Sequence, residues 1–145
     1  MFVLHIALQG CLRARDVEYG VTADTGGHIR YLLDLVRASS RNPAIDRIEI
    51  VTRAFVDPVH GECYDACVET IDARSRIVRL RSTDSGYLAK ERLWTQHDSL
   101  VAGVIAHIES LDRRPDVIHA HYADAGALAA DVHDRLGIPY VFTAH

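Results

Sequence analysis

The fold class of this sequence follows from the stretch Pro115-Asp-Val-Ile-His-Ala-His-Tyr-Ala-Asp-Ala-Gly126 and the residues that continue it to Thr143. Residues 117–120 are short, mostly apolar and partly β-branched, which predicts a strand. Residues 125–136 are rich in alanine and predict a helix. Gly137-Ile-Pro139 predicts a turn that starts a last strand over residues 140–143. A strand, a helix and a second strand in this order indicate neighbouring parallel strands joined by a crossover.

The rest of the sequence extends this alternation of strands and helices. Residues 2–8 are almost all apolar, as in a strand buried on both faces of a sheet. Residues 47–52 and 76–80 predict two further strands. Apolar residues recur at helical spacing from Gly26 onward and predict an amphipathic helix. An apolar stripe over residues 90–111, which includes Trp94, predicts one long helix that faces the core.

These elements predict an α/β fold in which strand and helix alternate throughout. We expect a Rossmann-like, three-layer domain with a parallel sheet in the middle and helices on both faces. Asp24 or Thr25 is expected to cap the helix that begins near Gly26.

The composition is that of an ordinary globular domain, with 48% hydrophobic and 25% charged residues among 145. The net charge of −4 comes without long blocks of like charge, so neither a nucleic acid nor a membrane is an expected partner. No apolar run approaches the ~20 residues that span a bilayer. Met1 leads directly into Phe2 without the basic region and cleavage site of a signal peptide, and we expect a cytoplasmic protein.

Two groups of residues offer metal-ligand chemistry. The first is His60, Cys63 and Cys67, which provide only three soft ligands where a structural zinc site needs four. The second is His119 and His121, which share a strand face without supplying the remaining ligands. Together with Cys11, the cysteines are odd in number and are expected to be reduced thiols. We expect neither a metal ion nor a cofactor.

The functional residues are expected in the loops at the carboxyl ends of the strands, where α/β folds bind ligands. Gly26-Gly27-His28 lies where a long loop enters a helix, so backbone amides and the positive helix end can meet an anionic group. The alternative is a turn that needs glycine for its backbone conformation.

Residues 119–126 bring together two imidazoles, the phenol of Tyr122 and the carboxylate of Asp124. Such groups donate and accept hydrogen bonds and suit the recognition of a polyhydroxyl ligand, while Asp124 is expected to cap the following helix. His145 follows the last strand, either as a site residue or as a frayed end.

Four segments, in this order, resemble the sucrose-phosphate synthase and sucrose synthase family: Asp24-Thr-Gly-Gly27, Lys90-Glu-Arg-Leu-Trp94, residues 115–126 and Val141-Phe-Thr-Ala-His145. The resemblance covers the chain from about Leu4 to His145. Members of this family are retaining glycosyltransferases with the GT-B architecture of two Rossmann-like domains. The resemblance implies that residues 1–145 are the N-terminal, acceptor-side domain, an incomplete half of that fold, and that the C-terminal nucleotide-sugar-binding domain is absent from them.

The resemblance also implies a function, namely transfer of a hexosyl group from a nucleotide diphosphate sugar to a sugar or sugar-phosphate acceptor. Residues 1–145 alone are expected to be inactive. By position, Gly26 and Gly27 match the loop that approaches the donor phosphates and the acceptor, and His28 stands where the synthases usually have glutamine. Tyr122 matches an acceptor-contacting tyrosine. His145 matches a histidine that approaches the transferred sugar and is the expected catalytic residue.

Two departures from the family pattern concern the acceptor and the sugar site. Gly86 occupies the position of a lysine that faces the acceptor phosphate in sucrose-phosphate synthases, which argues against fructose 6-phosphate as acceptor. Lys90 or Arg92 would compensate, unless both only solvate the first turn of their helix. Ala144 replaces the customary glycine before His145.

Two other functions remain open alongside hexosyl transfer. A sugar-binding or assembly module without catalysis would use the same surface. A different Rossmann-type enzyme would need a glycine-rich dinucleotide motif or a nucleophile elbow, and neither motif occurs. The apolar faces of the predicted layers also lead us to expect self-association of this 145-residue chain.

Overall fold

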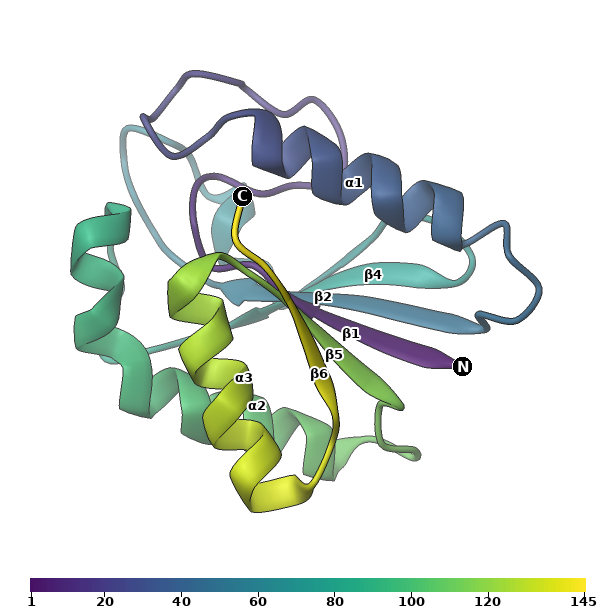
Figure 1. Cartoon of the computed structure of the whole chain (residues 1–145). Helices are drawn as coiled ribbons and strands as arrows, with labels where there is room; N and C mark the ends of the chain where they lie inside the picture. Colours follow the sequence, from purple (N-terminus) through teal and green to yellow (C-terminus); the bar gives the residue numbers. More distant parts are fainter.

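The computed structural model describes all residues 1–145 and has three layers (Figure 1). The middle layer is a six-stranded sheet in the order β3-β4-β2-β1-β5-β6. Its strands are β1 (Phe2–Ile6), β2 (Arg47–Arg53), β3 (Val68–Thr70), β4 (Ser75–Leu80), β5 (Val117–His121) and β6 (Tyr140–Thr143). Helix α1 (Gly27–Ser39) covers one face, and α2 (His97–Ser110) and α3 (Tyr122–Leu136) cover the other. The predicted Rossmann-like fold is confirmed.

Alternating side chains of the buried strands build a core on each side of the sheet. Leu4 and Ile6 of β1 join the cluster under α2 and α3, whereas Val3 and Ala7, the residue after β1, pack in the cluster under α1. This alternation follows from the two-residue period of a strand, and burial on both faces explains why β1 is almost all apolar. No helix combines the length and the hydrophobicity needed to cross a bilayer.

The predicted alternation of strands and helices is wrong between β2 and β4. The chain there forms a single 3-10 turn (Cys63–Asp65) and then β3, which pairs antiparallel with β4, so the sheet is mixed. A tight turn joins β3 to β4, in which Asp72 accepts a hydrogen bond from the Arg74 amide at 2.8 Å. A two-residue pattern cannot be recognised in a strand of three residues, which is why β3 was not predicted.

The predicted long helix over residues 90–111 is broken in two. Residues Lys90–Gln96 form a 3-10 helix, η2, and α2 begins at His97. Side chains three apart line up in a 3-10 helix, so Leu93 and Gln96 are buried while Trp94 turns outward and is 52% exposed. Trp94 therefore does not belong to the core as predicted. The Gln96 side chain instead accepts a hydrogen bond from the Asp84 amide at 2.8 Å and ties η2 to the preceding loop.

A fully buried carboxylate connects the sheet to α2. Glu49 lies in β2, and it accepts hydrogen bonds from Arg47 at 3.1 Å and from Arg76 Nε at 2.9 Å. His107 of α2 lies 2.7 Å from its other oxygen. Burial by itself would raise the pKa of Glu49, but the hydrogen bonds from His107, Arg76 and Arg47 outweigh it and lower the pKa to about 2. The carboxylate is therefore charged and fully partnered.

Strand β6, drawn in yellow in Figure 1, forms one edge of the sheet and carries exposed apolar side chains. Val141 is 52% and Phe142 50% exposed. An unpaired edge strand with apolar side chains is a site for strand pairing between molecules. We predict that the 145-residue chain self-associates with increasing concentration in light scattering, and that Val141→Lys reduces this. A strictly monomeric chain at high concentration would contradict the prediction.

Candidate functional site

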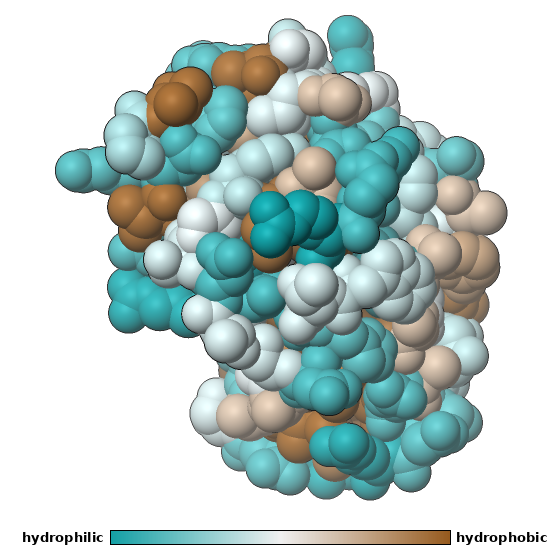
Figure 2. All heavy atoms as spheres, turned by 90° about the vertical axis from the view of Figure 1, so that its left-hand side faces the viewer, coloured by the Kyte–Doolittle hydropathy of each residue, from teal (hydrophilic) through white to brown (hydrophobic).

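The carboxyl ends of β1, β5 and β6 lie next to each other and define one rim of the sheet. Parallel pairing puts these ends on the same side, together with the start of α1 and of α3 (Figure 1). Figure 2 looks at this side of the molecule, where the surface is largely hydrophilic with separate apolar patches. The predicted functional loops meet here, as expected for ligand sites of α/β sheets.

Three of the predicted site residues are in contact at this rim. The rings of His28 and Tyr122 meet edge to face with 5.0 Å between their centres. The ring of His145 lies 5.0 Å from that of Tyr122 and 6.2 Å from that of His28. Gly26 and Gly27 directly precede His28 at the start of α1. Residues from three distant parts of the sequence thus form one group.

The start of α1 has no side-chain cap, and the loop before it is fixed by hydrogen bonds of Asp24 and Thr25. Gly26 is the N-cap residue, and neither Asp24 nor Thr25 caps the helix, so that prediction is wrong. Thr25 accepts a hydrogen bond from the Cys11 amide at 3.0 Å, and Asp24 accepts one from the Lys90 amide, also at 3.0 Å. Both side chains are used to position the loop. The first amides of α1 are left for water or an anionic ligand.

Gly10 determines how closely the two ends of the long loop before α1 approach each other. It has a positive φ of 81°, a conformation that favours glycine. A Cβ atom here would lie well inside contact distance of the Asp24 carbonyl oxygen. Close approach of backbone to backbone, and not ligand contact, explains this glycine.

The loop around Gly86 is held by a buried arginine. Arg53, at the end of β2, donates to the Gly86 carbonyl at 2.6 Å and to Ser82 Oγ at 2.7 Å, and also to the Asp84 carbonyl. Burial lowers the pKa of Arg53. Lys90 is exposed and reaches the group only through its backbone, which binds Asp24. The surroundings of Gly86 are open, since a methyl group added there would meet only Asp84 Oδ1, at 3.5 Å.

Tyr122 and Asp124 lie at the junction of β5 and α3. Tyr122 adopts a φ of 72°, which is uncommon for a residue with a side chain and costs roughly 1–2 kcal/mol. Asp124 was predicted to cap α3, but His121 is the N-cap residue and Asp124 lies in the first turn. Its pKa is raised, first by burial. Gln9 is its side-chain partner, at 3.4 Å, and supports the predicted structural role.

Behind His145 lies a group of histidines that the sequence did not indicate as a group. His121 Nδ1 is hydrogen-bonded to His145 Nε2 at 2.9 Å, and His121 Nε2 to His5 Nδ1 at 3.1 Å. His119 stacks on His121 with 4.2 Å between ring centres. His5 was overlooked because a single histidine in an apolar strand gives no local signal. Its proximity arises only from the pairing of β1 with β5.

The imidazoles of this site are uncharged near neutral pH. Burial is the largest cause that lowers the pKa values of His28, His119 and His145. Burial, followed by the neighbouring histidines, lowers the pKa of His121 to about 3. The rim therefore offers neutral hydrogen-bonding groups beside a positive helix end, which fits a polyhydroxyl ligand that carries an anionic group.

A second hollow, at the amino ends of the strands, is no competing site. It is lined by charged residues that include Arg47, Arg76, Asp112 and Arg113. These arginines already bind carboxylates, as Arg47 does with Asp112 at 2.8 Å and Arg76 with Glu49. Their positive charges are paired with carboxylates of the protein itself. The hollow also lies far from the carboxyl ends, where the predicted residues meet.

Comparison with known proteins identifies the family of this chain from its sequence. The sequence model of the glycosyl transferase 4-like domain matches residues 26–145. Sucrose-phosphate synthase 4 of Arabidopsis thaliana is 31% identical over the whole chain, and the sucrose-phosphate synthase of Zea mays is 32% identical. The chain spans only 16% of the length of each of these two relatives.

The solved structure of the sucrose-phosphate synthase from Thermosynechococcus elongatus shares the fold. It superposes with a TM-score of 0.75 at 19% identity, over 99% of this chain and 33% of that one. The match of the family model to most of the residues, together with these relatives, leads to one conclusion. The chain belongs to the glycosyl transferase 4-like domain family and is similar in sequence to sucrose-phosphate synthases.

Proposed function

We propose that residues 1–145 form the acceptor side of a glycosyltransferase that moves a hexosyl group from a nucleotide diphosphate sugar to a sugar or sugar-phosphate acceptor. The meeting of Gly26-Gly27-His28, Tyr122 and His145 at one rim is the observation that carries this proposal. We place the nucleotide-binding residues in a second, C-terminal domain of the parent protein, and the catalytic cleft between the two domains. The transfer retains the configuration at the anomeric carbon.

The start of α1 supplies the electrostatic part of this mechanism. When the bond between the hexosyl group and the diphosphate breaks, negative charge grows on the phosphate oxygens. The amides that follow Gly26 and the positive end of the helix dipole face this charge and stabilise it. Glycine at positions 26 and 27 lets the phosphates approach the backbone closely, and an added Cβ at either position would meet nothing within 4 Å.

The neutral side chains orient the sugars. His145 binds a hydroxyl of the transferred hexose, Tyr122 contacts the acceptor, and no covalent nucleophile is involved. The anomeric carbon gains positive charge in the transition state, so uncharged imidazoles avoid a repulsion that imidazolium ions would create. His121 holds the His145 ring through the 2.9 Å hydrogen bond. Catalysis is then positioning combined with charge stabilisation.

The acceptor preference depends on Gly86. A charged hydrogen bond to a phosphate is worth about 1.5–3 kcal/mol, which corresponds to about one to two orders of magnitude in affinity. Without that lysine, we propose that an unphosphorylated sugar is preferred to fructose 6-phosphate. Lys90 and Arg92 are exposed cations, and we propose that Lys90 contacts a phosphate if one is bound.

Gly86→Lys is predicted to shift this preference toward phosphorylated acceptors by about 10- to 100-fold in kcat/KM. The position accepts a side chain, because an added Cβ would meet only Asp84 Oδ1 at 3.5 Å and the φ of Gly86 is not positive. The ratio of kcat/KM for matched acceptors with and without phosphate measures the effect. Gly86→Ala is the control and leaves the ratio unchanged. An equal ratio in the lysine variant and the control contradicts this placement of the acceptor.

His28 gives a second, independent test of the site. His28→Gln, which restores the residue usual in the synthases, is expected to keep activity, because the amide also hydrogen-bonds a sugar. His28→Ala is expected to lower kcat/KM about tenfold through the loss of one hydrogen bond of about 1–1.5 kcal/mol. Steady-state kinetics on both variants decide the matter. Equal losses in both variants contradict a hydrogen-bonding role.

The function itself is tested on the full parent protein with a panel of nucleotide sugars and acceptors, each with and without phosphate. Mass spectrometry identifies the products, and the anomeric configuration is read by NMR. Transfer to at least one acceptor is expected. Sugar binding without transfer from any donor would instead indicate a non-catalytic sugar-binding or assembly module on the same fold.

A further inference from the structure

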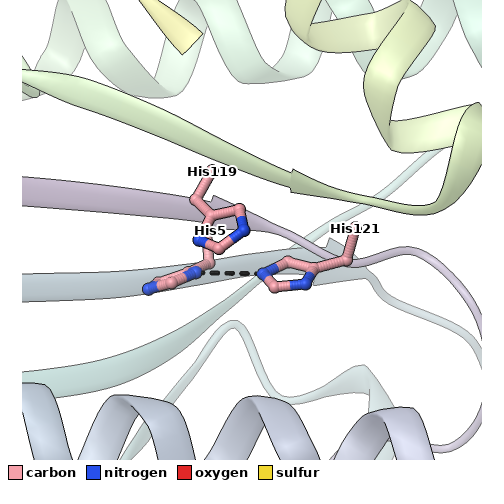
Figure 3. A group of neighbouring side chains, drawn as sticks. All are labelled: His5, His119 and His121. Carbon is pink, nitrogen blue, oxygen red and sulfur yellow. Dashed lines mark hydrogen bonds between the residues drawn. The ribbon is translucent and has the colours of Figure 1, made fainter. Parts of the chain in front are cut away.

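Three histidines point into one space between the sheet and α1 (Figure 3). His5 of β1 and His119 of β5 stand opposite each other in the parallel register, and His121 is two residues further along the same strand face. Each offers one ring nitrogen, and the three nitrogens lie within 4.8 Å of one another. His5 thus supplies the third ligand that the sequence did not reveal beside His119 and His121.

The spacing of these nitrogens is close to that of a metal site. A Zn–N bond of about 2.1 Å in tetrahedral geometry sets ligand nitrogens roughly 3.4 Å apart. His5 Nδ1 and His121 Nε2 are 3.1 Å apart, and the His119 nitrogen lies within 4.8 Å of both. Two neutral imidazoles share one proton at this contact. A metal ion would replace that single hydrogen bond by two coordinate bonds.

Two of the rings also have the outer partners that are typical of ligating histidines. A metal-bound imidazole usually hydrogen-bonds a second group through its other nitrogen, and this fixes the ring. His121 Nδ1 contacts His145 Nε2 at 2.9 Å, opposite the nitrogen that faces His5. His119 Nε2 contacts Thr143 Oγ1 at 2.7 Å, which holds its ring against β6. The orientation of the rings is therefore set before any ion enters.

We propose that His5, His119 and His121 bind one divalent transition metal ion of the class that imidazole prefers, such as Zn²⁺. A set of three imidazoles with no thiolate or carboxylate suits zinc, copper and nickel rather than magnesium or calcium. Three protein ligands leave a fourth position for water. His119 is half-buried and is the least buried of the three ligands.

The site is coupled to His145 through His121. With Nε2 on the metal, His121 carries its proton on Nδ1 and donates it to His145 Nε2. His145 then carries its own proton on Nδ1. The ion thereby selects one of the two tautomers of a ring at the proposed sugar site, and this consequence, unlike metal binding itself, rests on the proposed function.

The test uses the 145-residue chain without a histidine tag and after removal of metals by a chelator. Zn²⁺ titration by calorimetry is expected to show one ion per chain, and Co²⁺ to give the visible absorption of a tetrahedral site. His119→Ala, at the least buried ligand, is expected to weaken Zn²⁺ binding by more than about a hundredfold, beyond the loss of an outer partner.

Matched variants separate this site from other metal-binding groups. The double variant Cys63→Ser with Cys67→Ser removes the exposed thiols near His60 and is expected to keep the affinity of the parent chain. Circular dichroism checks that each variant is folded, and His5→Gln provides a second ligand change if His119→Ala is not. Absence of binding at micromolar Zn²⁺, or equal binding by the folded ligand variants, overturns the proposal.

The coupling to His145 has its own readout. Long-range ¹H–¹⁵N spectra of the histidine rings report which nitrogen carries the proton. Addition of Zn²⁺ is expected to move the His145 signals to those of the Nδ1-protonated form. Unchanged His145 signals in the zinc-bound chain contradict the coupling. Because both measurements need no substrate, they fail or succeed independently of the transferase assay.

Discussion

Glu49→Gln is expected to lower the free energy of unfolding by about 3–5 kcal/mol, which is typical of breaking a buried ion network by removing one partner. The amide keeps the shape of the side chain but removes the negative charge beside Arg76 in a place where the carboxylate itself is fully buried, while Arg47 keeps Asp112 as a partner. It also weakens the contact with His107, which attaches α2 to the sheet. Urea unfolding followed by circular dichroism measures the loss.

Glu109→Gln is the matched control, since Glu109 is exposed on the same helix as His107 and should change stability by less than about 0.5 kcal/mol. The same buried carboxylate, Glu49, predicts an acid limit. Its pKa is lowered from 4.5 to about 2 by folding, so its stabilisation is complete above pH 4.5 and is lost as the pH falls toward 2. The free energy of unfolding falls by about 3 kcal/mol over this pH range. An acid transition that is unchanged in Glu49→Gln contradicts this assignment.

Gly10→Ala is expected to cost about 3 kcal/mol or more and to abolish most of the transferase activity of the parent protein. The new methyl group meets the Asp24 carbonyl and comes within 3.1 Å of Ile29 Cδ1, in addition to the strain of a positive φ. The Asp24-to-Gly27 segment has to shift, which moves the amides of α1 away from the proposed phosphate position.

Gly20→Ala separates the effect of the steric contact with Asp24 from the effect of the positive φ. Gly20 has nearly the same φ, 83°, but an added Cβ there meets nothing within 4 Å. Its substitution carries only the conformational cost of about 1–2 kcal/mol and should leave kcat/KM close to that of the parent. Thermal unfolding and steady-state kinetics on both variants provide the comparison. Equal effects of the two substitutions show that contact with Asp24 is unimportant.

The parts of the fold that could be predicted from the sequence are those in which local pattern and tertiary packing agree. The β5-α3-β6 unit has a buried strand, an apolar helix face and a glycine turn, and each is visible in neighbouring residues. The prediction of one helix over residues 90–111 was wrong because periods of 3.0 and 3.6 residues per turn cannot be told apart over the seven residues of η2. Which periodicity holds is decided by the Gln96 contact to the loop, a tertiary interaction.

The site was predicted only in part, for a related reason. The rim is a property of parallel strands, so placing His28, Tyr122 and His145 together followed from the order of the elements. The cluster around His121 depends on a contact with His5 across 116 positions of sequence, for which no local signal exists. The predicted cap of α1 was wrong because Asp24 and Thr25 accept hydrogen bonds from the distant amides of Lys90 and Cys11. Each side chain could have capped the helix or bonded a distant amide, and the tertiary structure favours the distant amide.

The hydrogen bonds from Arg53 to the loop of residues 82–86 have a consequence for evolution. Two of the three Arg53 contacts go to backbone carbonyls, which every amino acid carries. Side chains at positions 83, 85 and 86 are therefore free to change while the loop keeps its course. New substrate preferences can then arise by single mutations at this loop without repacking the interior, and directed libraries at these three positions are the natural place to seek them.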